Sequence, residues 1–161
     1  QYLDIVSRLR HAHPRIGVST DVIVGFPGES ESDFEQTVEA IEAAAFDSAF
    51  VFKYSARRGT SAAARSDIVP ETVIAERHAR VLDAVTRIAR QRYQRMVGQT
   101  VQVLVEGPSR RNPARLEGRT RCNKIVVFSG APRHVGRLLD VHIVRASAVT
   151  LYGGAGDSGP L

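Results

Sequence analysis

Basic and aromatic residues gather directly after one apolar segment of the chain. Residues 48–52 form the apolar run, and Lys53, Tyr54, Arg57 and Arg58 follow it. Cationic and aromatic side chains in one place suit a ligand that carries negative charge or an adenine ring. A solvated loop is the alternative interpretation. We favour ligand binding, because the cluster lies where a predicted strand ends.

An aspartate inside a second apolar run is the other residue that could do chemistry. The run 16–24 predicts a strand, in which Asp21 shares one face with Ser19 and Ile23. A carboxylate in a buried strand is costly unless it is paired or holds a ligand. A structural partner, such as an arginine on another strand, and a ligand role stay equally open.

The strand over 16–24 ends at the turn Gly25-Phe-Pro-Gly28. Glycines let the backbone turn sharply or approach a ligand closely, and the proline stiffens the turn. The turn is not the phosphate loop of nucleoside triphosphatases, because no Lys-Ser or Lys-Thr pair follows its second glycine. Glu29, the next residue, would also repel an anion.

A strand–helix–strand unit must position these residues. Ser32-Asp-Phe-Glu35 is a capping-box pattern that predicts a helix start, and apolar residues follow at helical spacing. With strands over 16–24 and 48–54, the unit predicts parallel strands joined by a right-handed crossover. Ligands bind beyond the C-terminal ends of such strands. The predicted ligand site consists of Asp21, Gly25, Lys53, Tyr54 and Arg57.

Two further helices are predicted, over residues 1–10 and from Pro70 to about Val97, where Gly98 ends the second one. The outer face of the long helix is basic. We interpret it as a solvated face rather than as a nucleic-acid contact. Its arginines are Arg77, Arg80, Arg87, Arg90, Arg92 and Arg95.

From Thr100 the hydrophobic period changes to two. Short strands are predicted there and over 116–122, 125–128, 138–144 and 149–152, a pattern typical of a small closed barrel of the OB type. Phe128 is expected in the barrel core rather than stacked on a base. We therefore divide the chain into residues 1–97, residues 98–152 and a flexible tail over 153–161.

The net charge of +5 lies entirely in the second half of the chain. Residues 98–161 hold nine Lys/Arg and four Asp/Glu, whereas residues 1–97 hold 13 of each. Such a split predicts that the second part faces a polyanion. The candidate residues are Arg110, Arg111, Arg115, Arg119, Arg121 and Lys124.

Cys122 is the single cysteine, so the chain has no internal disulfide and cannot by itself hold zinc or an iron–sulfur cluster. The five histidines lack ligand-spaced companions, and we expect no metal site. The first residues do not have the pattern of a signal peptide, and the first residue is not methionine. We expect a soluble cytoplasmic chain, the C-terminal piece of a longer protein.

Three stretches together carry a resemblance: STDVIVGFPGESESDF at 19–34, FDSAFVFKYSARRGT at 46–60 and GRTRCNKIVVF at 118–128. The first two resemble the end of the radical S-adenosylmethionine (SAM) barrel of tRNA methylthiotransferases. The third resembles the signature of that family's TRAM domain, a small RNA-binding barrel. The resemblance implies an α/β fold: the C-terminal part of a parallel, partial TIM-type barrel, followed by an OB-like TRAM barrel.

The resemblance also implies a function. The family uses a 4Fe-4S cluster and S-adenosylmethionine to methylthiolate C2 of N6-dimethylallyladenosine beside the anticodon. The strand-end residues would then lie on the SAM and substrate side, and the basic barrel would bind the tRNA anticodon stem-loop, in a full-length protein that we expect to be a monomer. The tRNA-binding candidates are Arg110, Arg111, Arg119, Arg121 and Lys124.

One departure limits what this chain can do. The family's CxxxCxxC motif and its N-terminal methylthiotransferase domain are absent, so we expect residues 1–161 alone to be inactive. A non-catalytic RNA-binding fragment is one alternative. A methylthiotransferase for a ribosomal protein is another, against which the basic second half argues.

Overall fold

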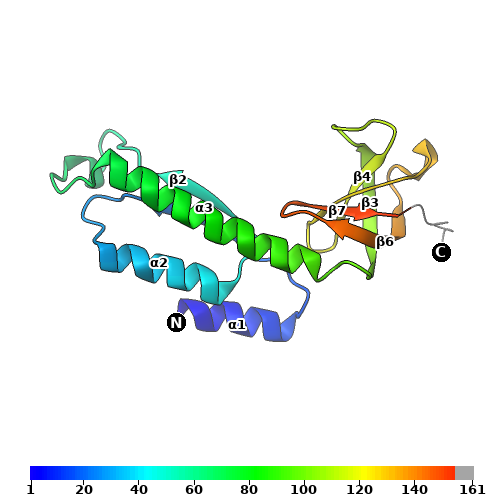
Figure 1. Cartoon of the computed structure of the whole chain (residues 1–161), viewed down its shortest axis with the longest axis horizontal. Helices are drawn as coiled ribbons and strands as arrows, with labels where there is room; N and C mark the ends of the chain where they lie inside the picture. Colours follow the sequence, from blue (N-terminus) through cyan, green and yellow to red (C-terminus); the bar gives the residue numbers. More distant parts are fainter. Residues whose placement is uncertain (155–161) are drawn as a thin grey trace. The chain divides into compact units, whose positions relative to one another are not determined.

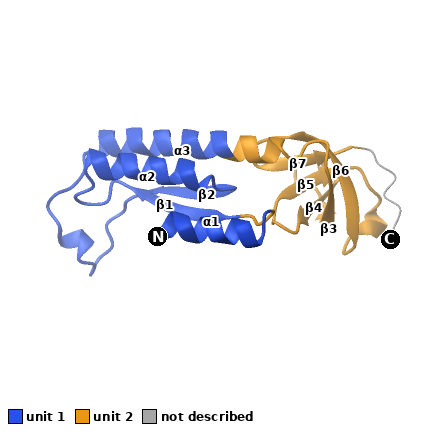
Figure 2. Ribbon diagram, turned by 90° about the horizontal axis from the view of Figure 1, so that it is seen from below, with its two compact units in different colours: residues 1–14, 18–88 blue, residues 15–17, 89–161 orange. Residues whose placement is uncertain are grey.

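The computed structural model describes residues 1–154 and divides the chain into two compact units (Figure 2). Residues 1–14 and 18–88 form the first unit, and residues 15–17 join those from 89 onward in the second. The expected tail over 153–161 lies largely outside the described residues. No helix in the described part is long and apolar enough to cross a membrane.

The first unit contains a strand–helix–strand unit with additional helices (Figure 1). Its elements are α1 (Tyr2–Ala12), β1 (Ser19–Val24), α2 (Glu31–Ala44), β2 (Ser48–Lys53), the short 3-10 helix η1 (Ala62–Ala64) and α3 (Glu71–Gln94), which continues into the second unit.

Strands β1 and β2 pair in parallel, as predicted, with Asp21 opposite Phe50 and Val24 opposite Lys53. Alternation along each strand separates two faces. Val22 and Val24 are buried in a core shared with α1, α2 and α3, and Val51 packs against it. The other face, with Ile23, Phe50 and Phe52, is exposed. Asp21 lies on this exposed face, so its carboxylate is not in a packed interior.

The predicted start of α2 is wrong by two residues. The N-cap is Ser30, whose hydroxyl accepts a hydrogen bond from the Asp33 amide at 3.2 Å. The Asp33 carboxylate accepts in return from the Ser30 amide at 3.0 Å, which completes the capping box. Ser32 and Glu35 match the same pattern in sequence, but they already lie inside the helix. A hydrogen bond with Ser30 lowers the pKa of Asp33.

The inner face of α3 includes Arg77, a residue that was predicted to lie on the outer face. Ile74, Val81, Val85 and Ile88 are buried in the core. Arg77 belongs to the same stripe, because it lies three residues after Ile74 and four before Val81, and it is buried as well. The prediction that Arg77 lies on the outer face of the helix is wrong.

The second unit is a closed barrel, which together with the parallel sheet confirms the predicted fold class. The strand order is β3-β4-β5-β7-β6, with β5 and β7 parallel and the other pairs antiparallel. Its elements are β3 (Thr100–Pro108), β4 (Leu116–Thr120), β5 (Ile125–Phe128), the 3-10 helix η2 (Pro132–His134), β6 (Leu138–Ala146) and β7 (Thr150–Gly153).

Alternating valine, leucine and isoleucine side chains from all five strands fill the barrel. Phe128 is 1% exposed, which confirms that it belongs to the core. Tyr93, Met96 and Val97, from the end of α3 and the residues after it, join the same core. The last turn of α3 therefore belongs to the barrel unit.

Candidate ligand and RNA sites

The C-terminal ends of β1 and β2 bring three of the predicted ligand residues together. Val24 pairs with Lys53, so Gly25 and Tyr54 follow at the same edge of the sheet. The Tyr54 amide donates to the Val24 carbonyl at 2.8 Å. Phe26 meets the Tyr54 ring edge-on, with 5.2 Å between the ring centroids. Gly25, Lys53 and Tyr54 thus share the edge at which parallel sheets bind ligands.

The other two predicted residues lie farther from this edge or outside the strands. Asp21 precedes Val24 by three residues, roughly 10 Å along the strand. Arg57 is exposed in the loop after β2, and no ion pair joins it to another residue in the part that the structure describes. Lys53 is already engaged, since its Nζ lies 2.9 Å from Glu71 Oε1 at the start of α3.

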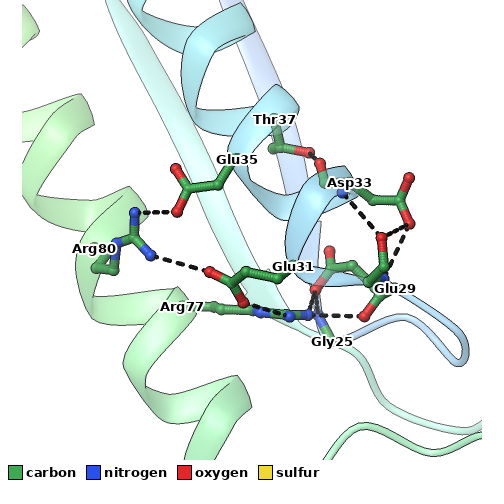
Figure 3. A network of polar contacts seen from close by, with 9 residues as sticks. Gly25, Glu29, Glu31, Asp33, Glu35, Thr37, Arg77 and Arg80 are labelled. Carbon is green, nitrogen blue, oxygen red and sulfur yellow. Dashed lines mark hydrogen bonds and ion pairs between the residues drawn. The ribbon is translucent and has the colours of Figure 1, made fainter.

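A buried ion pair, absent from the sequence predictions, holds the glycine turn (Figure 3). Glu29 Oε2 accepts a hydrogen bond from the Gly25 amide at 2.9 Å and another from Arg77 Nη1 at 2.7 Å. Arg77 Nη1 also donates to the Glu29 carbonyl at 3.0 Å. The side chains of Arg77 and Glu29 are 6% and 10% exposed. Glu29 is therefore a structural anchor of the turn, and its charge is compensated by Arg77.

The turn needs its glycines for reasons of conformation and space. Gly25 has φ +76° and Gly28 has φ +81°, values that favour glycine. A Cβ at Gly25 would lie 2.5 Å from Ile74 Cγ1 of α3. The Gly28 amide donates to the Asp67 carbonyl at 2.8 Å. The backbone of the turn is thus fixed by α3 and by the segment before it.

Around the buried pair, α2 and α3 form a network of opposite charges. Arg77 Nη2 lies 2.9 Å from Glu31 Oε2, and Arg80 Nη2 lies 2.7 Å from Glu35 Oε1. Both guanidinium groups lie over the Phe34 ring, at 5.2 and 4.8 Å from its centroid. The carboxylates of α2 therefore neutralise these arginines of α3.

The pKa shifts follow from these contacts. Burial opposes the charge on Arg77, but hydrogen bonds with Glu31 and Glu29 outweigh it and raise the pKa of Arg77. The hydrogen bond from Arg77 lowers the pKa of Glu31. The spacing from Ile74 to Arg77 to Val81 was the sequence signal that could have shown Arg77 to be buried.

On the barrel, the predicted RNA-binding arginines of β4 and the turn after it make polar contacts. Arg119 Nη1 donates to Asn123 Oδ1 at 3.1 Å, and its Nε lies 3.5 Å from Glu106 Oε1. Arg121 Nε donates to Gln102 Oε1 at 3.1 Å. Neither contact buries the guanidinium group deeply, so both residues remain open to a ligand.

Lys124 occupies a different environment. It is 5% exposed, and its Nζ lies 5.3 Å from the centroid of the Tyr93 ring. A side chain in this position packs the end of α3 onto the barrel and offers little surface to RNA. We therefore omit Lys124 from the candidate RNA surface.

The remaining predicted residues lie at the other end of β4. Arg110 and Arg111 are in the loop before Leu116, whereas Arg121 follows Thr120. The five residues of β4 span about 17 Å. The structure therefore does not gather the predicted RNA residues into one compact patch.

No group of three or more His, Cys, Asp or Glu side chains suited to a metal ion occurs among residues 1–154. Cys122, the single cysteine, has its Sγ 3.2 Å from the Thr120 hydroxyl and 3.8 Å from Lys124 Nζ. One thiol cannot supply the ligands of an iron–sulfur cluster. The residues present do not fit such a cluster.

Comparison with known proteins agrees with the two-unit architecture. Residues 94–155 match the family model of the TRAM domain. Along nearly the whole chain, the sequence is similar to proteins named tRNA-2-methylthio-N(6)-dimethylallyladenosine synthase. The protein of Clostridium novyi is 45% identical over 94% of this chain and 34% of its own length. That of Methylacidiphilum infernorum is 44% identical over 95% of this chain and 33% of its own length.

The closed barrel and the match over residues 94–155 make this chain a TRAM-domain protein. The chain corresponds to the C-terminal region of the tRNA methylthiotransferases that it resembles, the region that carries the TRAM domain. It spans about a third of the length of the curated relatives it matches.

Proposed function

We propose that this chain serves tRNA methylthiolation, as the region of the enzyme that binds tRNA and closes one side of its active site. The reaction would place a methylthio group on C2 of N6-dimethylallyladenosine beside the anticodon. The names of the relatives, the TRAM match and the basic barrel support this function. The enzyme would act in the cytoplasm.

In this proposal the two parts of the chain have different tasks. Residues 1–97 supply a wall of the S-adenosylmethionine and substrate cavity through Asp21, Gly25, Lys53, Tyr54 and Arg57, and residues 98–152 bind the tRNA anticodon stem-loop. A region outside residues 1–161 would supply the 4Fe-4S cluster, because Cys122 cannot hold it. By itself the chain is then an RNA-binding module without methylthiotransferase activity.

The proposal rests on the difference between arginines that have carboxylate partners and arginines that have none among the described residues. Arg77, Arg80 and Arg87 of α3 form ion pairs with glutamates of the first unit. Among the arginines of the barrel strands, Arg119 forms an ion pair with Glu106, at 3.5 Å. Uncompensated arginines attract phosphates, and each neutralised phosphate releases counterions.

The test measures binding of the full chain to an unmodified tRNA anticodon stem-loop by fluorescence anisotropy over a series of salt concentrations. We expect log affinity to fall linearly with log salt. In the variant Arg119→Gln/Arg121→Gln the slope should decrease by about 1–2. Absence of binding at low salt by the wild-type chain would refute RNA binding by residues 98–152.

A further inference from the structure

The barrel topology brings two loops to one end of the second unit. Residues 109–115 connect β3 to β4, and residues 129–137 connect β5 to β6. The Val105 amide of β3 donates to the Arg137 carbonyl at 2.9 Å, and the Gly136 amide donates to the Val105 carbonyl at 2.8 Å. A Cβ at Gly130 would lie 2.7 Å from Leu116 Cδ1 at the start of β4. We call this end, residues 109–115 and 129–137, the loop end.

The loop end carries positive charge without any carboxylate in its sequence. Neither 109–115 (SRRNPAR) nor 129–137 (SGAPRHVGR) contains Asp or Glu. No ion pair to a described residue involves any arginine of the two loops. Arg115 is half-buried and the others are exposed. The arginines are Arg110, Arg111, Arg115, Arg133 and Arg137.

Like charges gathered at one place repel one another and destabilise a fold, so such a cluster is expected where an anionic partner offsets the repulsion. The five arginines lie up to 27 residues apart in the sequence. The hydrogen bonds at Val105 tie residues 136–137 to β3, and the pairing of Leu116 with Phe128 brings the two loops to the same end of the barrel. Sequence reasoning found Arg110 and Arg111 but missed Arg133 and Arg137. The antiparallel connections of the barrel, rather than any local motif, place them together.

We propose that the loop end binds the phosphate backbone of RNA, with Arg133 and Arg137 completing a site begun by Arg110 and Arg111. This inference rests on the proposed tRNA-binding function. The two loops contain no Phe, Tyr or Trp on which a base could stack, and His134 is half-buried. The arginines of the loop end would contact phosphates. Phosphate contacts position an RNA but do not distinguish its bases. The proposal therefore predicts that binding at the loop end does not depend on base sequence.

The experiment uses the full chain and two RNA probes, the unmodified anticodon stem-loop and a stem-loop of equal length with a scrambled sequence. In Arg133→Gln/Arg137→Gln the salt slope should decrease by about 1–2 for both probes to the same extent. The matched control Arg90→Gln/Arg95→Gln removes the same charge from exposed positions on and just after α3, and should leave the slope unchanged. The variant Arg133→Lys/Arg137→Lys should keep the wild-type slope, which separates lost charge from a folding defect.

Three outcomes would overturn the inference in distinguishable ways. If Arg133→Gln/Arg137→Gln keeps the wild-type slope while Arg119→Gln/Arg121→Gln lowers it, RNA binds the barrel but not at the loop end. A decrease confined to the anticodon probe would refute sequence independence. If the wild-type chain binds neither probe, the proposed function fails together with this inference.

Discussion

The two units treat their arginines in opposite ways. In the first unit, α3 presents arginines to α2, where Glu31, Glu35 and Glu42 neutralise them at 2.6–2.9 Å. In the barrel, Glu106 forms an ion pair with Arg119, while the loop end has no carboxylate of its own. Five arginines lie on α3 and eight lie in residues 98–152, so the number of arginines alone marks both as basic surfaces. Arg77, Arg80 and Arg87 of α3 are paired with glutamates, whereas the arginines of the loop end form no ion pair with a described residue, and this difference supports the proposal that RNA binds the barrel.

The largest expected effect is a loss of stability on removal of Arg77, the buried arginine that pairs with Glu29. Arg77→Ala leaves the Glu29 carboxylate buried without its cation, which should destabilise the first unit by about 3 kcal/mol. Arg87→Ala breaks an exposed pair with Glu42 and should cost at most about 1 kcal/mol. Native-state hydrogen exchange of the β1 and α2 amides measures both values in the first unit, without assuming that the two units unfold together.

A double variant tests whether the cost at Arg77 is electrostatic. Arg77→Met/Glu29→Gln removes both charges, while the glutamine can still accept the hydrogen bond from the Gly25 amide. It should be more stable than the single variant Arg77→Met, which fills the same space but leaves the Glu29 charge buried without a cation. Equal stability of Arg77→Met and the double variant would show that the uncompensated charge of Glu29 is not the source of the cost.

The second prediction concerns a variant in which arginines of α3 lose their carboxylate partners on α2. In Glu35→Gln/Glu42→Gln, Arg80 and Arg87 lose partners at 2.7 and 2.6 Å, and Arg80 keeps the longer pair with Glu31 at 3.4 Å. If compensation is what keeps RNA off α3, this variant should bind the stem-loop with a salt slope steeper by about 1–2. The control Asp4→Asn/Glu39→Gln changes the net charge equally. No ion pair joins Asp4 or Glu39 to another residue within 1–154. An equal increase in both variants would mean that net charge, and not local pairing, governs binding.

The sequence predicted those features of the structure that follow from local hydrophobic periodicity, and it missed those that depend on contacts between distant segments. The parallel pairing of β1 and β2 and the five barrel strands followed from hydrophobic period and turn residues, which act over short range. The burial of Arg77 was missed because an arginine on an apolar stripe is acceptable only with a partner, and Glu29 lies 48 residues away. The loop end was missed because residues 109–115 and 129–137 are joined by the barrel connections.

The last prediction, with the smallest effect, concerns a choice between two overlapping capping boxes. Both Ser30-Glu-Ser-Asp33 and Ser32-Asp-Phe-Glu35 fit the pattern, and the structure uses the first. Ser30→Ala removes the acceptor for the Asp33 amide and should destabilise the first unit by about 1 kcal/mol. Ser32→Ala should change stability by only a few tenths of a kcal/mol, because an exposed helical serine gives way to a better helix former.

Hydrogen exchange of the first-turn amides of α2 measures both serine variants. The turn 25–29 explains why the helix starts at Ser30 rather than at Ser32. Glu29 is fixed by Arg77 and the Gly25 amide, so the chain enters α2 immediately after it and Ser30 is the first residue able to cap the helix. If this is correct, Arg77→Ala should also weaken protection at the start of α2. A larger loss in Ser32→Ala than in Ser30→Ala would place the helix start at the later box and separate it from the buried ion pair.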